Sequence, residues 1–210
     1  MMRSTTRWSL FRKMSSRGHS WHNRGYLPHF DGGAITQSIT FRLFDSLPKT
    51  VLEEWSHELA QQSSDLRNNE IRRRIADYLD QGQGSCYLKQ PHVAKIVQDT
   101  ILFFDLDKYL LSGWVVMPNH VHMVTTLLPG KPLAGIVQSL KSFTANEANK
   151  VLDRHGTFWM PDYFDRYIRN ERHLAAAIAY VENNPVKAGL CRRPEDWPFT
   201  SAWFRKREEW

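Results

Sequence analysis

The chain has 210 residues, with 28 Lys and Arg against 22 Asp and Glu, and therefore a formal net charge of +6. Hydrophobic residues make up 41% of the chain and charged residues 24%, which excludes a disordered polypeptide and allows a buried core. No apolar run reaches the roughly 18 residues that a membrane helix needs, so the composition predicts a cytoplasmic protein that attracts polyanions and has no membrane partner.

The first 33 residues (1–33) are predicted to form a basic arm, ahead of a domain over 34–190 and a tail over 191–210. Up to Phe30 the chain has no acidic residue, aromatic residues are interleaved, and the cations are Arg3, Arg7, Arg12, Lys13, Arg17 and Arg24. Cations for phosphates and flat side chains for unpaired bases suit single-stranded nucleic acid. A solvated arm without a partner is the alternative.

The hydrophobic periodicity predicts, in chain order, a strand over 34–44, helices over 49–62, 69–79 and 91–102, a strand pair over 109–127, a helix from Pro132, an extended segment over 158–168 and a helix over 171–183. Asn170 is placed to cap the last helix and Pro185 to stop it. This order of elements predicts an α+β domain, in which helices cover one side of an antiparallel sheet.

A His-x-His pair, His120 and His122, lies in the segment GWVVMPNHVHMVTTL of the predicted strand pair. Residues two apart on a strand point to the same face, so both imidazoles project together, while Val121 and Met123 point into the core. Two neutral imidazoles side by side provide half of a site for a divalent metal. Because two ligands do not complete a site, a pair of solvent-facing histidines without a metal is the alternative.

A second candidate site lies in the segment ERHLAAAIAYVENNPVKAGL, where Leu174, Ile178 and Val181 form the stripe expected to pack on the sheet. Tyr180 lies about 200° around the helix from Ile178, so its hydroxyl need not be buried in that stripe. Asn184 follows one turn later on the same face. A tyrosine that only covers the core and an asparagine that only ends the helix are the structural alternative.

Reaction chemistry links the two candidate sites. A tyrosine hydroxyl has a pKa of about 10 and is a poor nucleophile at neutral pH. A cation bound by the imidazoles would neutralise phosphate charge and stabilise the developing anion. Tyr180 could then cleave a phosphodiester and keep it as a covalent phosphotyrosine, with Asn184 as the third, oxygen ligand. Two imidazoles and an amide oxygen suit Mg²⁺ or Mn²⁺ as the cofactor.

Three sequence elements, WVVMPNHVHMV, YVENNPVKAGL and DWPFTSAW, together resemble the single-tyrosine HUH transposase superfamily. Within it the chain is most similar to the REP-associated tyrosine transposases, relatives of the IS200/IS605 enzymes. The resemblance runs from about Arg24 to Trp203 and covers most of the chain. It implies a ferredoxin-like α+β fold, with the histidine pair on a central strand and the nucleophile on a later helix.

The resemblance also implies an activity: cleavage and rejoining of single-stranded DNA at repetitive extragenic palindromes, which form imperfect hairpins. Carried over residue by residue, it implies a metal held by His120, His122 and Asn184. Tyr180 is the implied nucleophile, which attacks the scissile phosphate, forms a 5′-phosphotyrosine and releases a 3′-hydroxyl that can later reseal the strand. Such an enzyme would act at the bacterial nucleoid, and a monomer is slightly favoured over a homodimer.

The hairpin is expected to lie along basic surface. The candidate DNA-binding residues are Arg24, Arg72, Arg73, Arg74, Lys141, Arg166 and Arg169. For the three consecutive arginines a solvated helix face is the alternative. Arg166 and Arg169 flank the aromatic segment just before the helix of Tyr180, and are therefore expected nearest to the site.

Three other functions stay open from the sequence. Another HUH enzyme, a relaxase or a replication initiator, would use the same covalent chemistry. A non-catalytic module would hold structured single-stranded DNA with the histidine pair empty. A metal hydrolase would activate water and leave Tyr180 passive. Only the transposase and the other HUH enzymes form a covalent protein–DNA adduct, so this adduct separates them from the binding module and the metal hydrolase.

Overall fold

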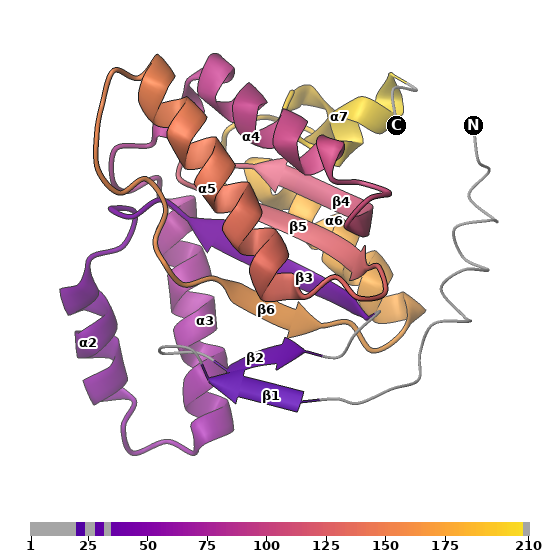
Figure 1. The fold of residues 1–210 in the computed structure, drawn as a ribbon. Helices are drawn as coiled ribbons and strands as arrows, with labels where there is room; N and C mark the ends of the chain where they lie inside the picture. The colour runs from indigo at the N-terminus through magenta and orange to yellow at the C-terminus, as the bar shows by residue number, and fades with distance from the viewer. Residues whose placement is uncertain (1–19, 24–27, 32–34, 208–210) are drawn as a thin grey trace.

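The computed structural model describes residues 20–23, 28–31 and 35–207 (Figure 1). Arg24 and the other cations of the predicted arm lie outside the described residues. Two short strands, β1 (Ser20–Asn23) and β2 (Pro28–Asp31), pair with each other in an antiparallel ribbon. In the part of the chain that the structure describes, no helix is both long enough and apolar enough to span a membrane.

A four-stranded antiparallel sheet forms the centre of the fold. Its strands are β3 (Thr36–Arg42), β4 (Tyr109–Val116), β5 (His120–Leu127) and β6 (Phe164–Tyr167), and their spatial order is β4-β5-β3-β6. One helical connection joins β3 to β4, a tight turn joins β4 to β5, and a second helix joins β5 to β6. This β-α-β-β-α-β succession is the ferredoxin-like arrangement, so the predicted fold class is confirmed.

Helices cover both faces of this sheet. On one face, α4 (Pro91–Phe103) and α5 (Leu133–Val151) bury a core that includes Val121 and Met123 of β5. On the other face, α6 (Glu171–Lys187) buries Leu174 and Val181 against Val124. Figure 1 shows α4 and α5 in front of the sheet and α6 behind it. The prediction that helices cover one side only is therefore wrong.

Two further helices, α2 (Lys49–Glu58) and α3 (Ser64–Asp80), are inserted between β3 and α4. Ile75 and Leu79 of α3 pack beside Phe164 of β6, so α3 lies at the β6 edge of the sheet. Short helical segments complete the chain: η1 (Tyr87–Lys89), η2 (Pro194–Asp196) and α7 (Ser201–Lys206). The last of these packs on β4 through an edge-to-face contact between Phe204 and Trp114.

The helix α6 begins as predicted and ends later than predicted. The Asn170 side chain accepts a hydrogen bond from the amide of His173 and so caps the first turn. Pro185 lies inside the helix and does not stop it, because a proline this close to the end removes only one backbone hydrogen bond. The chain leaves the helix at Gly189, whose φ of 70° favours glycine.

Candidate active site

The two histidines of the HxH pair share the face of β5 that α6 covers. His120 and His122 are 1% and 4% exposed, and their ring centroids are 4.7 Å apart. The structure therefore brings both imidazoles together, as their spacing on the strand predicts. It also buries them, so they are not solvent-facing residues.

A second layer of hydrogen bonds fixes which nitrogen of each ring is available. Nδ1 of His120 lies 2.7 Å from Oδ1 of Asn119, and the amide nitrogen of Asn119 donates to the carbonyl of Gln83. Because Oδ1 can only accept, the proton of the His120 ring is on Nδ1. Nδ1 of His122 lies 2.6 Å from the hydroxyl of Thr40, its cross-strand neighbour on β3. Both Nδ1 atoms are thus engaged, and both Nε2 atoms are left without a hydrogen-bond partner among the described residues. Metal-binding histidines are oriented in this way, with one ring nitrogen held by a protein group and the other available.

Burial keeps both rings neutral. It lowers the pKa of His122 to about 4, and the charge of Lys187 adds to this effect. Burial likewise lowers the pKa of His120 well below its ordinary value, with His122 as the next cause. Both imidazoles are therefore in the neutral form at neutral pH, which a metal ligand requires.

Acid is expected to destabilise the metal-free protein through these histidines. The folded-state pKa of His122, about 4, lies below the unfolded value of about 6.5, so the unfolded chain binds more protons in that window. The stabilising contribution of neutral His122 is complete above the unfolded pKa and is lost as pH falls toward 4. We expect it to decrease by about 2 kcal/mol between pH 7 and pH 5. Urea unfolding with a chelator at the two pH values measures this, and a His122→Gln variant should show a smaller decrease; an equal decrease would contradict the assignment.

Tyr180 and Asn184 of α6 lie over the histidine pair. The ring of Tyr180 contacts that of His122 edge to face, with the centroids 5.6 Å apart. Tyr180 itself is 43% exposed. Asn184 is buried at 1% exposure and acts on the pKa of both His120 and Tyr180. Burial raises the pKa of Tyr180, and Asp80 raises it further, so the phenol is protonated at neutral pH. Segments some sixty residues apart in sequence thus meet at one place.

The donor atoms at this place fit a divalent cation. Nε2 of His120, Nε2 of His122 and Oδ1 of Asn184 are buried, and none makes a hydrogen bond of normal geometry with a described residue. Buried polar atoms without partners are rare, and two imidazole nitrogens with an amide oxygen form an N/O donor set that Mn²⁺ or Mg²⁺ accepts. Over the described ranges no group of three His, Cys, Asp or Glu residues that could hold a metal is present, and the third donor atom at this place belongs to the Asn184 amide.

A cleft of about 680 Å³ opens beside this cluster. It lies between α3, β6 and α6, and its lining includes His122 and Tyr180. Four cations, Arg72, Arg73, Arg166 and Lys187, and two acids, Asp77 and Asp165, also line it. Arg72 is half-buried, and its Nε has no hydrogen-bond partner among the described residues. Arg166 is exposed. The cleft therefore joins the candidate nucleophile to a positively charged approach.

The remaining predicted DNA-binding residues lie elsewhere or are already paired. Arg73 binds Glu70 and Asp77, and Arg74 binds Glu58 and Glu70, so both sit in ion pairs on the surface of α3. This arrangement fits the alternative of a solvated helix face, although Arg73 also reaches the cleft wall. Arg169 is exposed between β6 and α6. His173 lines the cleft, and its pKa is lowered mainly by burial and further by the positive charges of Arg166 and Arg169.

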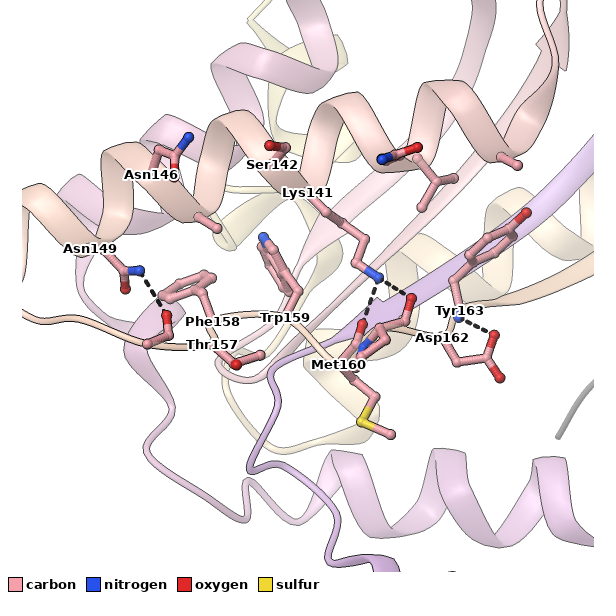
Figure 2. A pocket seen from close by; sticks show the side chains of 16 residues that line it. Lys141, Ser142, Asn146, Asn149, Thr157, Phe158, Trp159, Met160, Asp162 and Tyr163 are labelled. Atoms are coloured by element: carbon pink, nitrogen blue, oxygen red, sulfur yellow. Dashed lines mark hydrogen bonds between the residues drawn. The ribbon is translucent and has the colours of Figure 1, made fainter. Parts of the chain in front are cut away.

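Lys141 lies in a different hollow, between α5 and the segment that leads into β6. Figure 2 shows its side chain directed at the backbone, where Nζ donates to the carbonyls of Met160 and Pro161 at 2.6 and 2.7 Å. Burial lowers the pKa of Lys141 to about 8. Because α5 covers the opposite face of the sheet, this ammonium is separated from the histidine pair by the sheet itself.

Three residues that matter to the geometry were not assigned to the site from the sequence. Asn119 precedes the HxH pair directly, and its position in the PNHVH element is a usable signal. Thr40 joins the site only through the register of β3 against β5, which the sequence does not show. Lys187 lies two turns after Tyr180 on the same helix and lines the cleft.

Similarities to known proteins agree with this site. Residues 90–184, which include the histidine pair, Tyr180 and Asn184, match the protein family described as Transposase IS200 like. A REP-associated tyrosine transposase of Escherichia coli K12 is 30% identical over 93 residues, which are 43% of this chain and 53% of that protein. A Haemophilus influenzae relative is 27% identical over 96 residues, 41% of this chain and 54% of its own length. The chain thus spans about half the length of the curated relatives it matches.

The fold also has a solved counterpart. A structure of a REP-associated tyrosine transposase bound to a REP hairpin aligns with a TM-score of 0.53 and 18% identity, over 91% of this chain and 88% of that chain. The family match over residues 90–184 shows that the chain resembles the IS200-like transposases in sequence. Within that group the resemblance to REP-associated tyrosine transposases, first carried by the motifs, is confirmed.

Proposed function

We propose that the chain is a transposase and endonuclease of single-stranded DNA, which cleaves and rejoins strands at REP-type hairpins through a 5′-phosphotyrosine. The observation that supports this most strongly is the convergence of Tyr180 with two buried histidines, whose Nε2 atoms have no hydrogen-bond partner among the described residues. The similarity to transposases of this kind, and the hairpin bound by the solved relative, indicate the DNA substrate.

In the proposed reaction Tyr180 is the nucleophile. Its oxygen forms a bond to the scissile phosphorus, the bond from phosphorus to the 3′-oxygen breaks, and the released 3′-oxygen takes up the phenol proton and becomes the 3′-hydroxyl. The new phosphodiester retains the energy of the old one, so a 3′-hydroxyl can attack it and reseal a strand. Burial raises the pKa of Tyr180, so the phenol needs nearby positive charge to become a nucleophile.

We propose His120, His122 and Asn184 as the residues that hold Mg²⁺ or Mn²⁺. Such a cation, when bound, would withdraw charge from the phosphate and stabilise the anion that develops there. The chain's own contribution is to keep both rings neutral and fixed, through Asn119 and Thr40 at their Nδ1 atoms.

A denaturing gel tests the proposed function. Labelled single-stranded hairpin DNA is incubated with the protein and Mn²⁺, and the products are then separated under denaturing conditions. We expect label that stays with the protein, because the phosphotyrosine bond survives denaturation. Cleavage without such an adduct would instead indicate a hydrolase, and hairpin retention without cleavage a binding module.

Arg72 and Arg166 are proposed to contact DNA phosphates at the entrance of the cleft. Each contact to single-stranded DNA contributes about 0.7 to the slope of log affinity against log salt concentration. Arg72→Ala and Arg166→Ala should each reduce this slope by about that amount, and the double variant by about twice as much. Fluorescence anisotropy at several salt concentrations measures it. Lys150→Ala, which removes a cation paired with Glu147 on α5, serves as the control, and equal slopes in all variants would count against these contacts.

A further inference from the structure

Two carboxylates stand near the candidate tyrosine at the C-terminal end of α3. Asp77 and Asp80 lie in the last turn of that helix, which has no basic residue of its own. The helix dipole is negative at this end, and the two acids share a face at a spacing of three residues, so both are locally unfavourable. Burial is the main cause of the raised pKa of Tyr180, and the negative charges of Asp80 and Asp77 raise that pKa further. The two carboxylates therefore act electrostatically on the phenol.

Lys187 offsets both charges from the end of α6. Its Nζ lies 3.1 Å from Oδ1 of Asp77 and 2.8 Å from Oδ2 of Asp80. Asp77 has a second partner in Arg73, at 2.9 Å. Among the residues that the structure describes, by contrast, Lys187 is the one Lys or Arg within 4 Å of the Asp80 carboxylate. That carboxylate is only 9% exposed, so water screens its charge poorly.

The ion-paired group of Lys187, Asp77 and Asp80 lies beside the cleft, where it can affect the binding of DNA. Lys187 and Asp77 both line the cleft that also contains Tyr180 and His122. A DNA phosphate that reaches Tyr180 must enter this space. Without the ammonium, Asp80 would have no Lys or Arg within 4 Å among the described residues, and Asp77 would keep Arg73 alone. The negative charge left beside the cleft would then repel a polyanion. Because Nζ is already held by both carboxylates, its main effect on the phosphate is to cancel their charge.

We propose, on the basis of the function proposed above, that Lys187 is a positioning residue of the DNA-cleaving site, whose ammonium masks Asp77 and Asp80 and so admits a DNA phosphate to Tyr180. Two acids at the C-terminal end of α3 are unfavourable within that helix, and a lysine from another helix compensates their charge. Such a conflict between local preference and tertiary structure is typical of functional sites.

A charge-compensation experiment tests this role through hairpin affinity, measured by fluorescence anisotropy with a labelled imperfect hairpin in the absence of metal. Lys187→Met should weaken binding about tenfold, because it removes one of the two cationic partners of Asp77 and, among the described residues, the one Lys or Arg paired with Asp80. Adding Asp77→Asn and Asp80→Asn to the same chain should restore affinity to within about threefold of the parent. Lys95→Met, which removes a lysine paired with Asp99 on α4, is the matched control and should bind as the parent does.

The outcomes distinguish masking from other roles. The triple variant also lacks the bridge between α3 and α6, so a purely structural bridge predicts no recovery. A direct contact of Lys187 with the phosphate predicts none either. Failure to recover, or full affinity of Lys187→Met alone, would overturn the proposal. Because binding is measured without cleavage, the result does not depend on the adduct, whose absence in the parent protein would reject the proposed function instead.

Discussion

Replacing Tyr180 with Phe is expected to abolish the covalent protein–DNA adduct while hairpin affinity stays within about fivefold of the parent. The phenol oxygen is the atom that bonds to phosphorus in the proposed reaction, so its removal leaves no nucleophile. Loss of a catalytic nucleophile lowers rates by about 10⁴-fold or more, which places the adduct below detection. A single hydroxyl contributes only about 1 kcal/mol to binding, so affinity should change little. Denaturing gels and anisotropy measure the two quantities.

A matched control for this variant is Tyr163→Phe. Tyr163 lines the hollow around Lys141 on the other side of the sheet, away from the histidine pair. We expect this variant to form the adduct at the parental rate. An adduct that persists in Tyr180→Phe would show that another residue is the nucleophile.

Removing either histidine is expected to have the second largest effect. His120→Ala and His122→Ala should each weaken Mn²⁺ binding by at least about 100-fold, because they delete one of three proposed ligands, and even the loss of a supporting hydrogen bond costs 10- to 100-fold. Metal-dependent cleavage should fall in parallel. Isothermal titration calorimetry with Mn²⁺ alone gives the first quantity without reference to activity.

The control for the histidine variants is His92→Ala. His92 is exposed near the start of α4, on the opposite face of the sheet from the pair. It should bind Mn²⁺ as the parent does. Parental turnover in His120→Ala or His122→Ala would show that these rings do not hold the metal that cleavage requires.

Much of the fold follows from local patterns. The alternation around Val121 and Met123 predicts which side chains of β5 face the main core, and the Asn170 cap predicts where α6 begins. The sequence predicts the helix over 171–183 but not that it covers the second face of the sheet. Every residue of β5 is buried, including His120, His122 and two threonines. In sequence, by contrast, polar residues that alternate with apolar ones predict a strand with one face in solvent. Their burial becomes visible only when α6 is placed over them.

The candidate site divides in the same way. The HxH spacing alone predicts that two imidazoles share a face, because that requires only the geometry of one strand. Periodicity does not bring Tyr180 to them across sixty residues, and the motif resemblance supplied that expectation. The sequence also does not show which of the three consecutive arginines are neutralised by ion pairs. Acids of α2 and α3 neutralise Arg73 and Arg74, whereas the Nε of Arg72, beside the cleft, has no hydrogen-bond partner in the part of the chain that the structure describes. Only tertiary contacts distinguish these three arginines.

The measurement that tests the account most directly is mass-spectrometric mapping of the covalent adduct. The protein is incubated with hairpin DNA and Mn²⁺, treated with nuclease and protease, and its peptides are searched for a residual 5′-linked nucleotide. The account predicts the added mass on Tyr180, within the peptide that also carries Asn184. A modified peptide that contains Tyr163 or Tyr167 instead, or cleaved DNA with every tyrosine unmodified, would contradict it.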